Sequence, residues 1–292
     1  MIQFIQQLVN GLSLGSIYAL IALGYTMVYG IIKLINFAHG DIYMLGAYIG
    51  FIFATKTGMG FFPTLLVAMV FCSIIGVVIE RIAYKPLRNA TRITALITAI
   101  GVSYFLEAST QKVMGTSPRA FPNLLPSGNL NLGGVVITYQ QVFILSVTIL
   151  LMIGLQFVVT KTKIGRSMRA VSADTDVARL MGVNVDRTIS FTFALGSALA
   201  GAAGVLVGIY YNSINPLMGL VPGVKAFIAA VFGGIGIIPG AMVGGTLIGV
   251  IEALVSGYGS SLYKDAVVYI ILIVILIVKP AGLLGKNVKE KV

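Results

Sequence analysis

Long apolar runs separated by short polar connectors dominate the chain. Nine segments are almost free of charged residues and have the composition of membrane helices; they cover residues 4–32, 41–55, 61–78, 93–106, 142–160, 188–211, 226–238, 241–256 and 266–278. Because about 20 apolar residues cross the hydrocarbon core, this pattern predicts an all-α, polytopic integral membrane protein of about eight or nine transmembrane helices. No connector is long enough for a separate soluble domain, so residues 1–292 are expected to form a single transmembrane domain.

The seventh segment, residues 226–238, is predicted to be short or broken. Gly233, Gly234 and Gly236 interrupt its apolar pattern, and Pro239 follows directly. Irregular backbone at membrane depth occurs where it is buried in protein or lines a water-filled cavity. The segment is therefore either an element that lines a cavity or a kinked structural hairpin, and the pattern leaves both interpretations open.

Composition and charge agree with a membrane protein. Hydrophobic residues make up 58% of the chain and charged residues 10%, far below the roughly 25% charged residues of soluble domains. With the N-terminus outside, fifteen of the 20 basic residues fall on one face: Lys33, Arg81, Lys85, Arg88, Arg92, Lys161, Lys163, Arg166, Arg169, Arg179, Arg187, Lys279, Lys286, Lys289 and Lys291. The positive-inside rule makes this face and the C-terminus cytoplasmic. The net charge of +11 thus reflects topology, and no nucleic-acid partner is expected.

Two segments carry stripes of small residues at a spacing of four. The sixth segment has Gly196, Ala200, Gly204 and Gly208; the eighth has Gly240 with Gly244 and Gly245 with Gly249. Such stripes let helix backbones approach closely in lipid. They predict contact faces, either within this chain or against a second subunit.

The sequence predicts neither a catalytic centre nor a metal site. His39 is the single histidine, and Cys72 stands alone in an apolar run. A nucleophile with a base, paired carboxylates and the phosphate-binding pattern G-x-x-x-x-G-K-[ST] are all missing. The chain is therefore not expected to be an enzyme or to hold a cofactor. If ATP drives it, another subunit must bind the ATP.

The basic connector 161–187 is the most informative polar stretch. Ser172 or Asp174 can cap a short helix there, and Gly182 is placed to end it as a left-handed residue. Its Val177, Leu180 and Met181 follow helical spacing and share one face; the flanks are basic. Such a helix either docks into a groove of another protein or lies among lipid headgroups.

Several polar residues near or within the apolar segments are candidate functional groups. Asn36, His39 and Asp41 are expected at the cytoplasmic end between the first two segments, where Asp41 can stabilise a helix N-terminus. Lys225 is expected at the mouth of the seventh segment. Glu252 lies halfway along the eighth, where an ionisable group usually faces an interior cavity. Pairing of Lys225 with Glu252 is possible on the sequence alone.

The outer connector 107–141 is long and polar, with Pro118, Pro122 and Pro126. A loop of this length is either a flexible spacer or a docking platform for an external partner. The sequence does not distinguish between the two.

Motifs along nearly the whole chain resemble one family. They are NGLSLGSIYALIALGYTMVYGIIKLINFAHGD from residue 10, ERIAYKPLR from 80, GRSMRA from 165, ARLMGVNVDR from 178, INP from 214, KAFIAAVFGGIG from 225, IPGAMVGG from 238, YKD from 263 and PAGLLG from 280. Together they resemble the Liv-H type permease subunits of branched-chain amino-acid ABC importers. The resemblance implies a multi-pass permease of a bacterial-type inner membrane.

The resemblance also implies an ATPase-coupling helix in connector 161–187. The family pattern Glu-Ala-Ala-x-x-x-Gly maps onto Asp176-Val177-Ala178-Arg179-Leu180-Met181-Gly182, with Asp in place of Glu and Val in place of the first Ala. Arg169, in the motif GRSMRA, is counted with this coupling region. The implied partners are a sister permease subunit, two cytoplasmic ATPase subunits that bind ATP and magnesium, an external substrate-binding protein and the lipid bilayer.

The implied activity is ATP-driven import of leucine, isoleucine or valine. Candidate residues of the translocation path are Asn36, His39, Asp41, Lys225, Gly233, Gly234 and Glu252. The zwitterionic part of the substrate is expected to meet helix ends near Asn36 or in the broken seventh segment. The residue pattern without the resemblance leaves a rival: a self-sufficient secondary transporter or channel that uses Glu252, Asp41 or Lys225 as its coupling charge.

Overall fold

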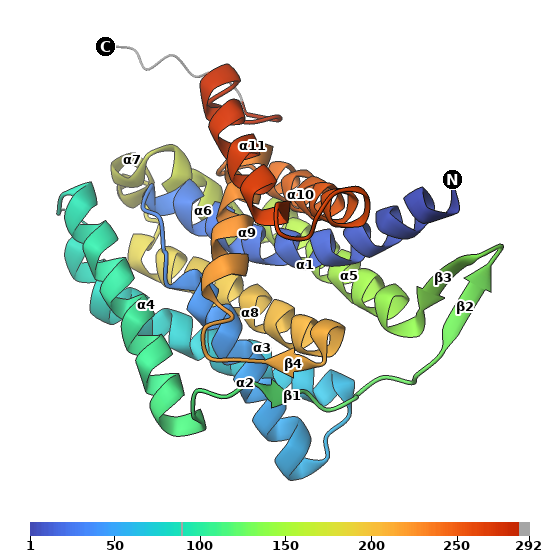
Figure 1. Ribbon diagram of the computed structural model, residues 1–292. Helices are drawn as coiled ribbons and strands as arrows, with labels where there is room; N and C mark the ends of the chain where they lie inside the picture. Colours follow the sequence, from blue (N-terminus) through green and yellow to red (C-terminus); the bar gives the residue numbers. More distant parts are fainter. Residues whose placement is uncertain (89, 286–292) are drawn as a thin grey trace.

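The computed structural model describes residues 1–88 and 90–285, which form a bundle of tilted helices (Figure 1). The longer elements are α1 (Ile2–Ile32), α2 (His39–Thr57), α3 (Phe61–Ile79), α4 (Arg92–Met114), α5 (Tyr139–Lys161), α8 (Val185–Tyr211), α9 (Leu220–Gly233), α10 (Ile238–Tyr258) and α11 (Lys264–Val278). Between them lie the short helices η1 (Glu80–Tyr84), η2 (Lys85–Leu87), α6 (Lys163–Ala173) and α7 (Thr175–Leu180). Each predicted segment corresponds to one helix, so the helical, polytopic architecture is confirmed.

Six helices of the described chain are long and apolar enough to cross a membrane. They are Ile2–Ile32, Phe61–Leu87, Ile93–Met114, Tyr139–Lys161, Val185–Tyr211 and Ile238–Tyr258. Helices α9 and α11 have 14 and 15 residues, fewer than a straight crossing needs. The structure therefore supports several crossings, whereas the predicted total of eight or nine depends on how α2, α9 and α11 are counted.

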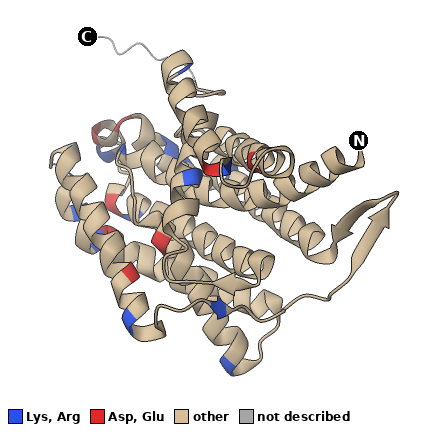
Figure 2. Cartoon of the chain, in the orientation of Figure 1, with Lys and Arg blue, Asp and Glu red and all other residues tan. Residues whose placement is uncertain are grey.

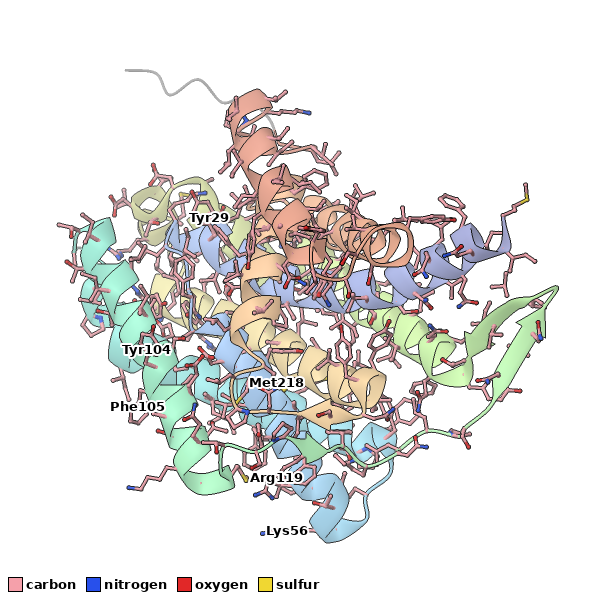
Figure 3. The ribbon with its side chains drawn as sticks, in the orientation of Figure 1. Tyr29, Lys56, Tyr104, Phe105, Arg119 and Met218 are labelled. Carbon is pink, nitrogen blue, oxygen red and sulfur yellow. The ribbon has the colours of Figure 1, made fainter. Side chains whose placement is uncertain are left out.

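Helices α1 and α8 form the centre of the bundle. The most apolar window of each is 89% buried, against 22% for α4 at the edge. Tyr104 and Phe105 on α4 point away from the other helices (Figure 3), and both side chains are exposed. The outer apolar faces of α3, α4 and α5 are thus available to lipid or to another subunit.

The small-residue stripes are contact faces within this chain. Gly245 and Gly249 of α10 face Ala19 and Gly15 of α1, and the Gly204 position of α8 lies against α2. Without side chains between them, the helix backbones approach closely enough to gain dispersion energy along the whole contact. Of the two interpretations that the sequence leaves open, the intramolecular one is confirmed for these stripes.

Substituting Gly15 by alanine is expected to destabilise the bundle strongly. A Cβ at Gly15 would lie 2.6 Å from Thr246 O and 2.8 Å from Thr246 Cα, so α1 and α10 would have to separate. The matched control is Gly101→Ala on α4, where nothing lies within 4 Å of the added Cβ. We expect the midpoint of thermal unfolding in detergent to be lower than the wild-type value for Gly15→Ala and unchanged for Gly101→Ala. Equal midpoints for the two variants would contradict the packing argument.

The path of residues 33–38 places His39 and Asp41 differently from the prediction. Lys33 ends α1 in the left-handed conformation, with φ 56°, and the chain then turns back along the bundle. The His39 side chain packs on Gly24, which lies eight residues before the end of α1, or about 12 Å along the helix. Helix α2 therefore begins inside the protein, and the prediction of a cytoplasmic end position for His39 and Asp41 is wrong.

The seventh segment also differs from its prediction. Helix α9 begins at Leu220, six residues earlier than predicted, and ends at Gly233. The break lies after it, where Gly234 and Gly236 have φ of 113° and 90° before α10 begins with Pro239 in its first turn. Lys225 consequently lies inside a helix and is buried; the prediction that it sits at the mouth of the segment is wrong.

The outer connector is shorter than predicted and contains short strands. Helix α4 continues to Met114 and so includes the first eight residues of the range 107–141. The remainder contains β1 (Arg119–Ala120), which pairs with β4 (Ser213–Ile214), and the hairpin of β2 (Asn129–Leu132) and β3 (Val135–Thr138). Gln6 of α1 bonds to the backbone of Val136 in this hairpin. The hairpin and the start of α1 therefore lie at one end of the bundle (Figure 1).

Candidate functional site

Helix α6 fastens the connector 161–187 to the bundle. Thr162 caps α6, and the helix buries Gly165, Met168 and Val171 on one face. The Arg169 guanidinium donates to the carbonyl of Val159. Ser172 donates to the carbonyl of Gly30 in α1 over 2.6 Å, so it anchors α6 and does not act as a helix cap. The sequence interpretation missed α6, although its spacing of buried residues is helical.

Helix α7 presents an apolar surface to the outside of the bundle. The Asp174 carboxylate accepts hydrogen bonds from the N–H groups of Asp176 and Val177, each at 2.9 Å, and Gly182 ends the turn at φ 82°. Val177, Leu180 and Met181 are 54, 87 and 79% exposed, whereas Ala178 is buried. Both the cap at Asp174 and the shared face are confirmed. This short helix thus exposes three apolar side chains that no other part of the described chain covers.

Ion pairs brace the region next to α7. Arg88 binds both Glu80, which is fully buried, and Asp186 at the start of α8. Lys85 also binds Asp186, at 2.7 Å. A cavity of about 410 Å³ opens between these groups, the end of α1 and α7; its lining includes Lys33, Arg88, Asp176 and Arg179. The sequence indicated a basic connector here, but the carboxylate partners become visible only in the fold.

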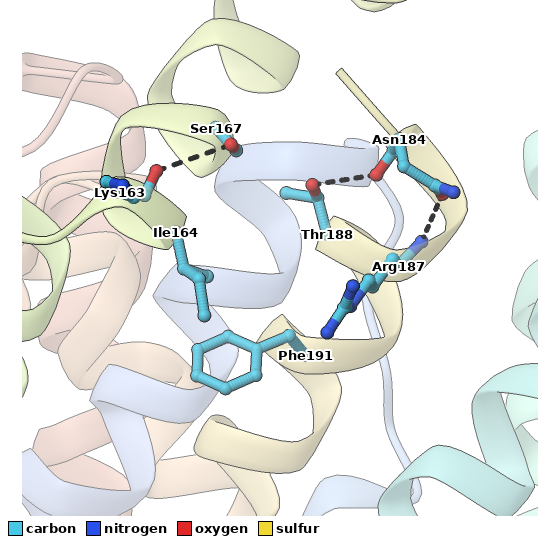
Figure 4. A pocket seen from close by; sticks show the side chains of 7 residues that line it. All are labelled: Lys163, Ile164, Ser167, Asn184, Arg187, Thr188 and Phe191. Atoms are coloured by element: carbon cyan, nitrogen blue, oxygen red, sulfur yellow. Dashed lines mark hydrogen bonds between the residues drawn. The ribbon is translucent and has the colours of Figure 1, made fainter. Parts of the chain in front are cut away.

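A second cavity, also of about 410 Å³, lies between α6 and the start of α8 (Figure 4). Phe191 and Ile164 form its apolar side, and Lys163 and Arg187 bring positive charge to it. Asn184 caps α8 by accepting from the Arg187 N–H at 2.9 Å. One cavity therefore adjoins α6 and the other adjoins α7.

Alanine at Gly182 is expected to loosen the end of α7. Nothing lies within 4 Å of an added Cβ, so the change adds only the cost of the left-handed conformation, about 1–2 kcal/mol. Gly58→Ala is the matched control, since Gly58 ends α2 at φ 65° with equally open surroundings. Both variants should lose similar thermal stability. A clearly larger loss of thermal stability in one of the two variants would contradict this account.

Four charged residues meet between α9, α10 and α11: Lys225, Glu252, Lys264 and Asp265. Figure 2 shows basic and acidic segments close together in this region. The Lys225 ammonium donates to Glu252 Oε1 at 2.8 Å and lies 2.6 Å from Asp265 Oδ1. Tyr18 of α1 donates to Glu252 Oε2 at 3.0 Å, and Lys264 Nζ lies 3.6 Å from Oε1. The side chains of Lys225 and Glu252 are each 3% exposed. The pairing that the sequence left open is present, and the first turn of α11 adds two members that the sequence interpretation missed.

An outer cavity of about 360 Å³ borders this charge cluster. It is lined by Tyr18, Tyr43, Tyr211, Ser213, Asn215, Leu217, Met218, Val221, Pro222, Lys225, Glu252, Lys264 and Asp265. Met218 lies in the chain between β4 and the start of α9 (Figure 3). The lining combines four charges with hydroxyl groups and an apolar side. A volume in the range of about 300–1,000 Å³ is usual for small-molecule sites.

The remaining candidate residues lie apart from this cavity. Asn36 accepts a hydrogen bond from Tyr84 at 2.9 Å, and His39 contacts the edge of Tyr25. An added Cβ at Gly219, which precedes α9, would lie 2.8 Å from the Asp41 carboxylate. Asn36, His39 and Asp41 are all buried. They fix the start of α2 inside the bundle.

The glycines of the seventh segment are packing positions. Gly233 lies directly against Gly240 of α10, and Gly234 lies against Gly285 in the chain after α11. Leu283 and Leu284 donate backbone hydrogen bonds to the carbonyls of Phe232 and Gly233. Gly236 and Ile238 of the same segment, by contrast, help to line a cavity beside Gly30 of α1, so the segment both packs against its neighbours and borders a cavity.

Residues 7–276 match the family model described as the permease component of the branched-chain amino acid transport system. The chain belongs to this family. It is 47% identical to the high-affinity branched-chain amino acid transport system permease protein BraD of Pseudomonas aeruginosa, over 99% of this chain and 98% of the relative. LivH of Escherichia coli K12 shows the same identity and coverage. A probable LivH of Methanocaldococcus jannaschii is 30% identical over 94% of this chain and 90% of the relative.

Family membership makes this chain a transport permease component and not an enzyme. Together with the apolar helices, it makes the chain a multi-pass membrane protein. The resemblance seen in the sequence motifs is confirmed.

Proposed function

We propose that this chain is the membrane-spanning subunit of an ATP-driven importer that translocates leucine, isoleucine or valine. The observation that carries the proposal is the 47% identity, over almost the full length of both chains, to permeases named for high-affinity branched-chain amino acid transport. Separate subunits bind and hydrolyse ATP. An external binding protein delivers the substrate.

Helix α7 is the docking element for an ATPase subunit in this proposal. Leu180 and Met181 insert into an apolar groove of that subunit, as amphipathic helices do, and Asp176 and Arg179 flank them. The Val183 N–H bonds to the Ala178 carbonyl at 3.0 Å, which joins α7 to the start of α8. Ser172 joins α6 to α1. Movement of the ATPases therefore reaches α1 and α8, the two central helices.

The chain crosses the membrane eight or nine times with its N-terminus outside. The hydrogen bonds of Gln6 support an outer end that contains the start of α1 and the β2–β3 hairpin. Connector 161–187 and the ion pairs of Arg88 mark the opposite, cytoplasmic end. Lys286, Lys289 and Lys291, which were counted for that face, lie outside the described residues. The ordered hairpin then faces the external binding protein.

A sister permease completes the translocation path. Lys225 and Glu252 belong to the path because they border the outer cavity, whereas Asn36, His39 and Asp41 shape its inner part. The bilayer and the sister subunit cover the exposed apolar faces of α3, α4 and α5.

The proposal is tested by extracting the tagged chain from its native membrane in a mild detergent. Mass spectrometry should find two ATPases and a second permease, and membrane vesicles supplied with the binding protein should take up radiolabelled leucine only with ATP. An importer known to survive the same detergent is the control. Uptake by the chain alone, driven by an ion gradient, would favour the secondary-transporter reading instead.

A further inference from the structure

The charge cluster between α9, α10 and α11 consists of a buried pair and a half-exposed pair. Lys225 and Glu252 are each 3% exposed, whereas Lys264 and Asp265 are 36 and 41% exposed. Each pair combines one cation with one anion, so the cluster is neutral as a whole. All four side chains border the outer cavity of about 360 Å³.

The two pairs differ in how well their polar atoms are satisfied. Glu252 accepts hydrogen bonds from Tyr18 and Lys225 on separate oxygens. Lys264 approaches Glu252 only to 3.6 Å. Asp265 Oδ1 is shielded from solvent and pairs with Lys225 Nζ at 2.6 Å, so a further donor can reach only the second oxygen of this carboxylate, Oδ2. The buried pair is complete, and the outer pair retains unused donor and acceptor capacity.

The outer pair lies at the start of a helix, which adds unbonded N–H groups to its own unused bonding capacity. Lys264 and Asp265 are the first two residues of α11, and no described side chain caps that helix. The N–H groups of a first helical turn, with the positive end of the helix dipole, favour an anionic group. A carboxylate near Lys264 would therefore meet both a full charge and free N–H groups.

Part of the cavity lining is apolar. Leu217, Met218, Val221 and Pro222 come from the chain that leads into α9 and from its first turn. An aliphatic side chain placed there would lose water contact, while a polar head group could remain at the charges. The cavity lining thus combines apolar side chains with one half-exposed cation and one half-exposed anion.

We propose that this outer cavity binds a zwitterionic, aliphatic α-amino acid, with its ammonium group on Asp265 and its carboxylate on Lys264 and the start of α11. The inference rests on the proposed function, and it deepens that function by assigning the residues that recognise the substrate. Lys225 and Glu252 are positioning residues: they hold the outer pair in place but remain bonded to each other and to Tyr18.

Charge balance explains why such a site would select zwitterions. A zwitterion places its ammonium group on Asp265 and its carboxylate on Lys264. The cluster together with the bound molecule then remains neutral. A solute with only one of the two charges would instead give the neutral cluster a net charge in a partly desolvated cavity, which is unfavourable. The site therefore discriminates by charge pattern, while the apolar part of the lining sets the preference for an aliphatic side chain.

The test is binding of radiolabelled leucine to the purified wild-type importer, with its sister permease and ATPases, in lipid nanodiscs without the binding protein. Competition by 4-methylpentanoate, which lacks the ammonium group, and by 3-methylbutylamine, which lacks the carboxylate, is measured in parallel. Both competitors should bind at least about tenfold more weakly than leucine, because a charge-assisted hydrogen bond is lost. Leucine uptake is recorded on the same preparations.

Two variants that each remove one charge assign the groups. Asp265→Asn should weaken leucine binding about tenfold or more and shrink its advantage over 4-methylpentanoate. Lys264→Gln should instead shrink the advantage over 3-methylbutylamine. Lys279→Gln, near the other end of α11, is the matched control and should leave all three affinities unchanged.

Three outcomes overturn the inference: no saturable leucine binding to the wild-type importer in any nucleotide state, unchanged affinities in both variants, or equal binding of leucine and the two competitors. If ATP-dependent leucine uptake by the wild type persists in such a case, the proposed function stands and only the site assignment fails. If wild-type uptake of leucine, isoleucine and valine is itself missing, the proposed function fails.

Discussion

Leu180→Asp is expected to release the ATPase subunits from this permease. The Leu180 side chain is 87% exposed, so the change removes no contact within the chain and should not alter its folding. At an interface, however, it removes a buried leucine, worth about 1.5–3 kcal/mol, and it adds a carboxylate to an apolar groove. We expect the ATPase recovered with the tagged permease, and ATP-driven leucine uptake, to fall at least about tenfold.

The control for this prediction is Leu262→Asp. Leu262 is 85% exposed and follows α10 at the opposite end of the bundle, so it matches Leu180 in residue type and exposure. The Leu262→Asp variant should co-purify with the ATPases as the wild type does. Full ATPase recovery with Leu180→Asp, or equal losses in the two variants, would argue against α7 as the docking helix.

The features that the sequence predicted correctly depend on local signals. Helix α7 needs a capping carboxylate at Asp174 and a residue free to adopt positive φ at Gly182, and both can be read from a stretch of nine residues. The nine segments likewise depend on the composition of continuous runs. The glycine stripes predicted contact faces because only small residues at a spacing of four permit close backbone approach.

The features that the sequence did not predict depend on tertiary contacts. Nothing in the pattern before His39 shows that the chain turns back at Lys33, because the turn is set by packing of His39 on Gly24. One of the two partners of Arg88 is distant in sequence: Asp186 lies 98 residues away. From the sequence alone, Lys264 and Asp265 have the position of residues at the membrane interface. Only the packing of α11 beside α9 and α10 brings them to the buried pair. A scan for ionisable residues at the ends of short apolar segments could have indicated them.

Lys225→Met is expected to have the largest effect on stability of any single change at the charge cluster. It leaves Glu252 buried without its ammonium partner and takes from Asp265 the cation at 2.6 Å. Breaking one side of a buried ion pair costs about 3–5 kcal/mol, mainly because the remaining charge stays desolvated. The midpoint of thermal unfolding of the detergent-solubilised permease should therefore fall clearly below that of the wild type.

Two further variants separate the uncompensated charge from the loss of packing. Lys225→Met combined with Glu252→Gln restores neutrality, so it should recover much of the stability that Lys225→Met loses. Lys264→Met removes a cation that is 36% exposed and 3.6 Å from Glu252, and its cost should remain within about 1 kcal/mol. If the double variant is no more stable than Lys225→Met, the penalty comes from packing at α9. The charge cluster would then not be held together by the buried pair.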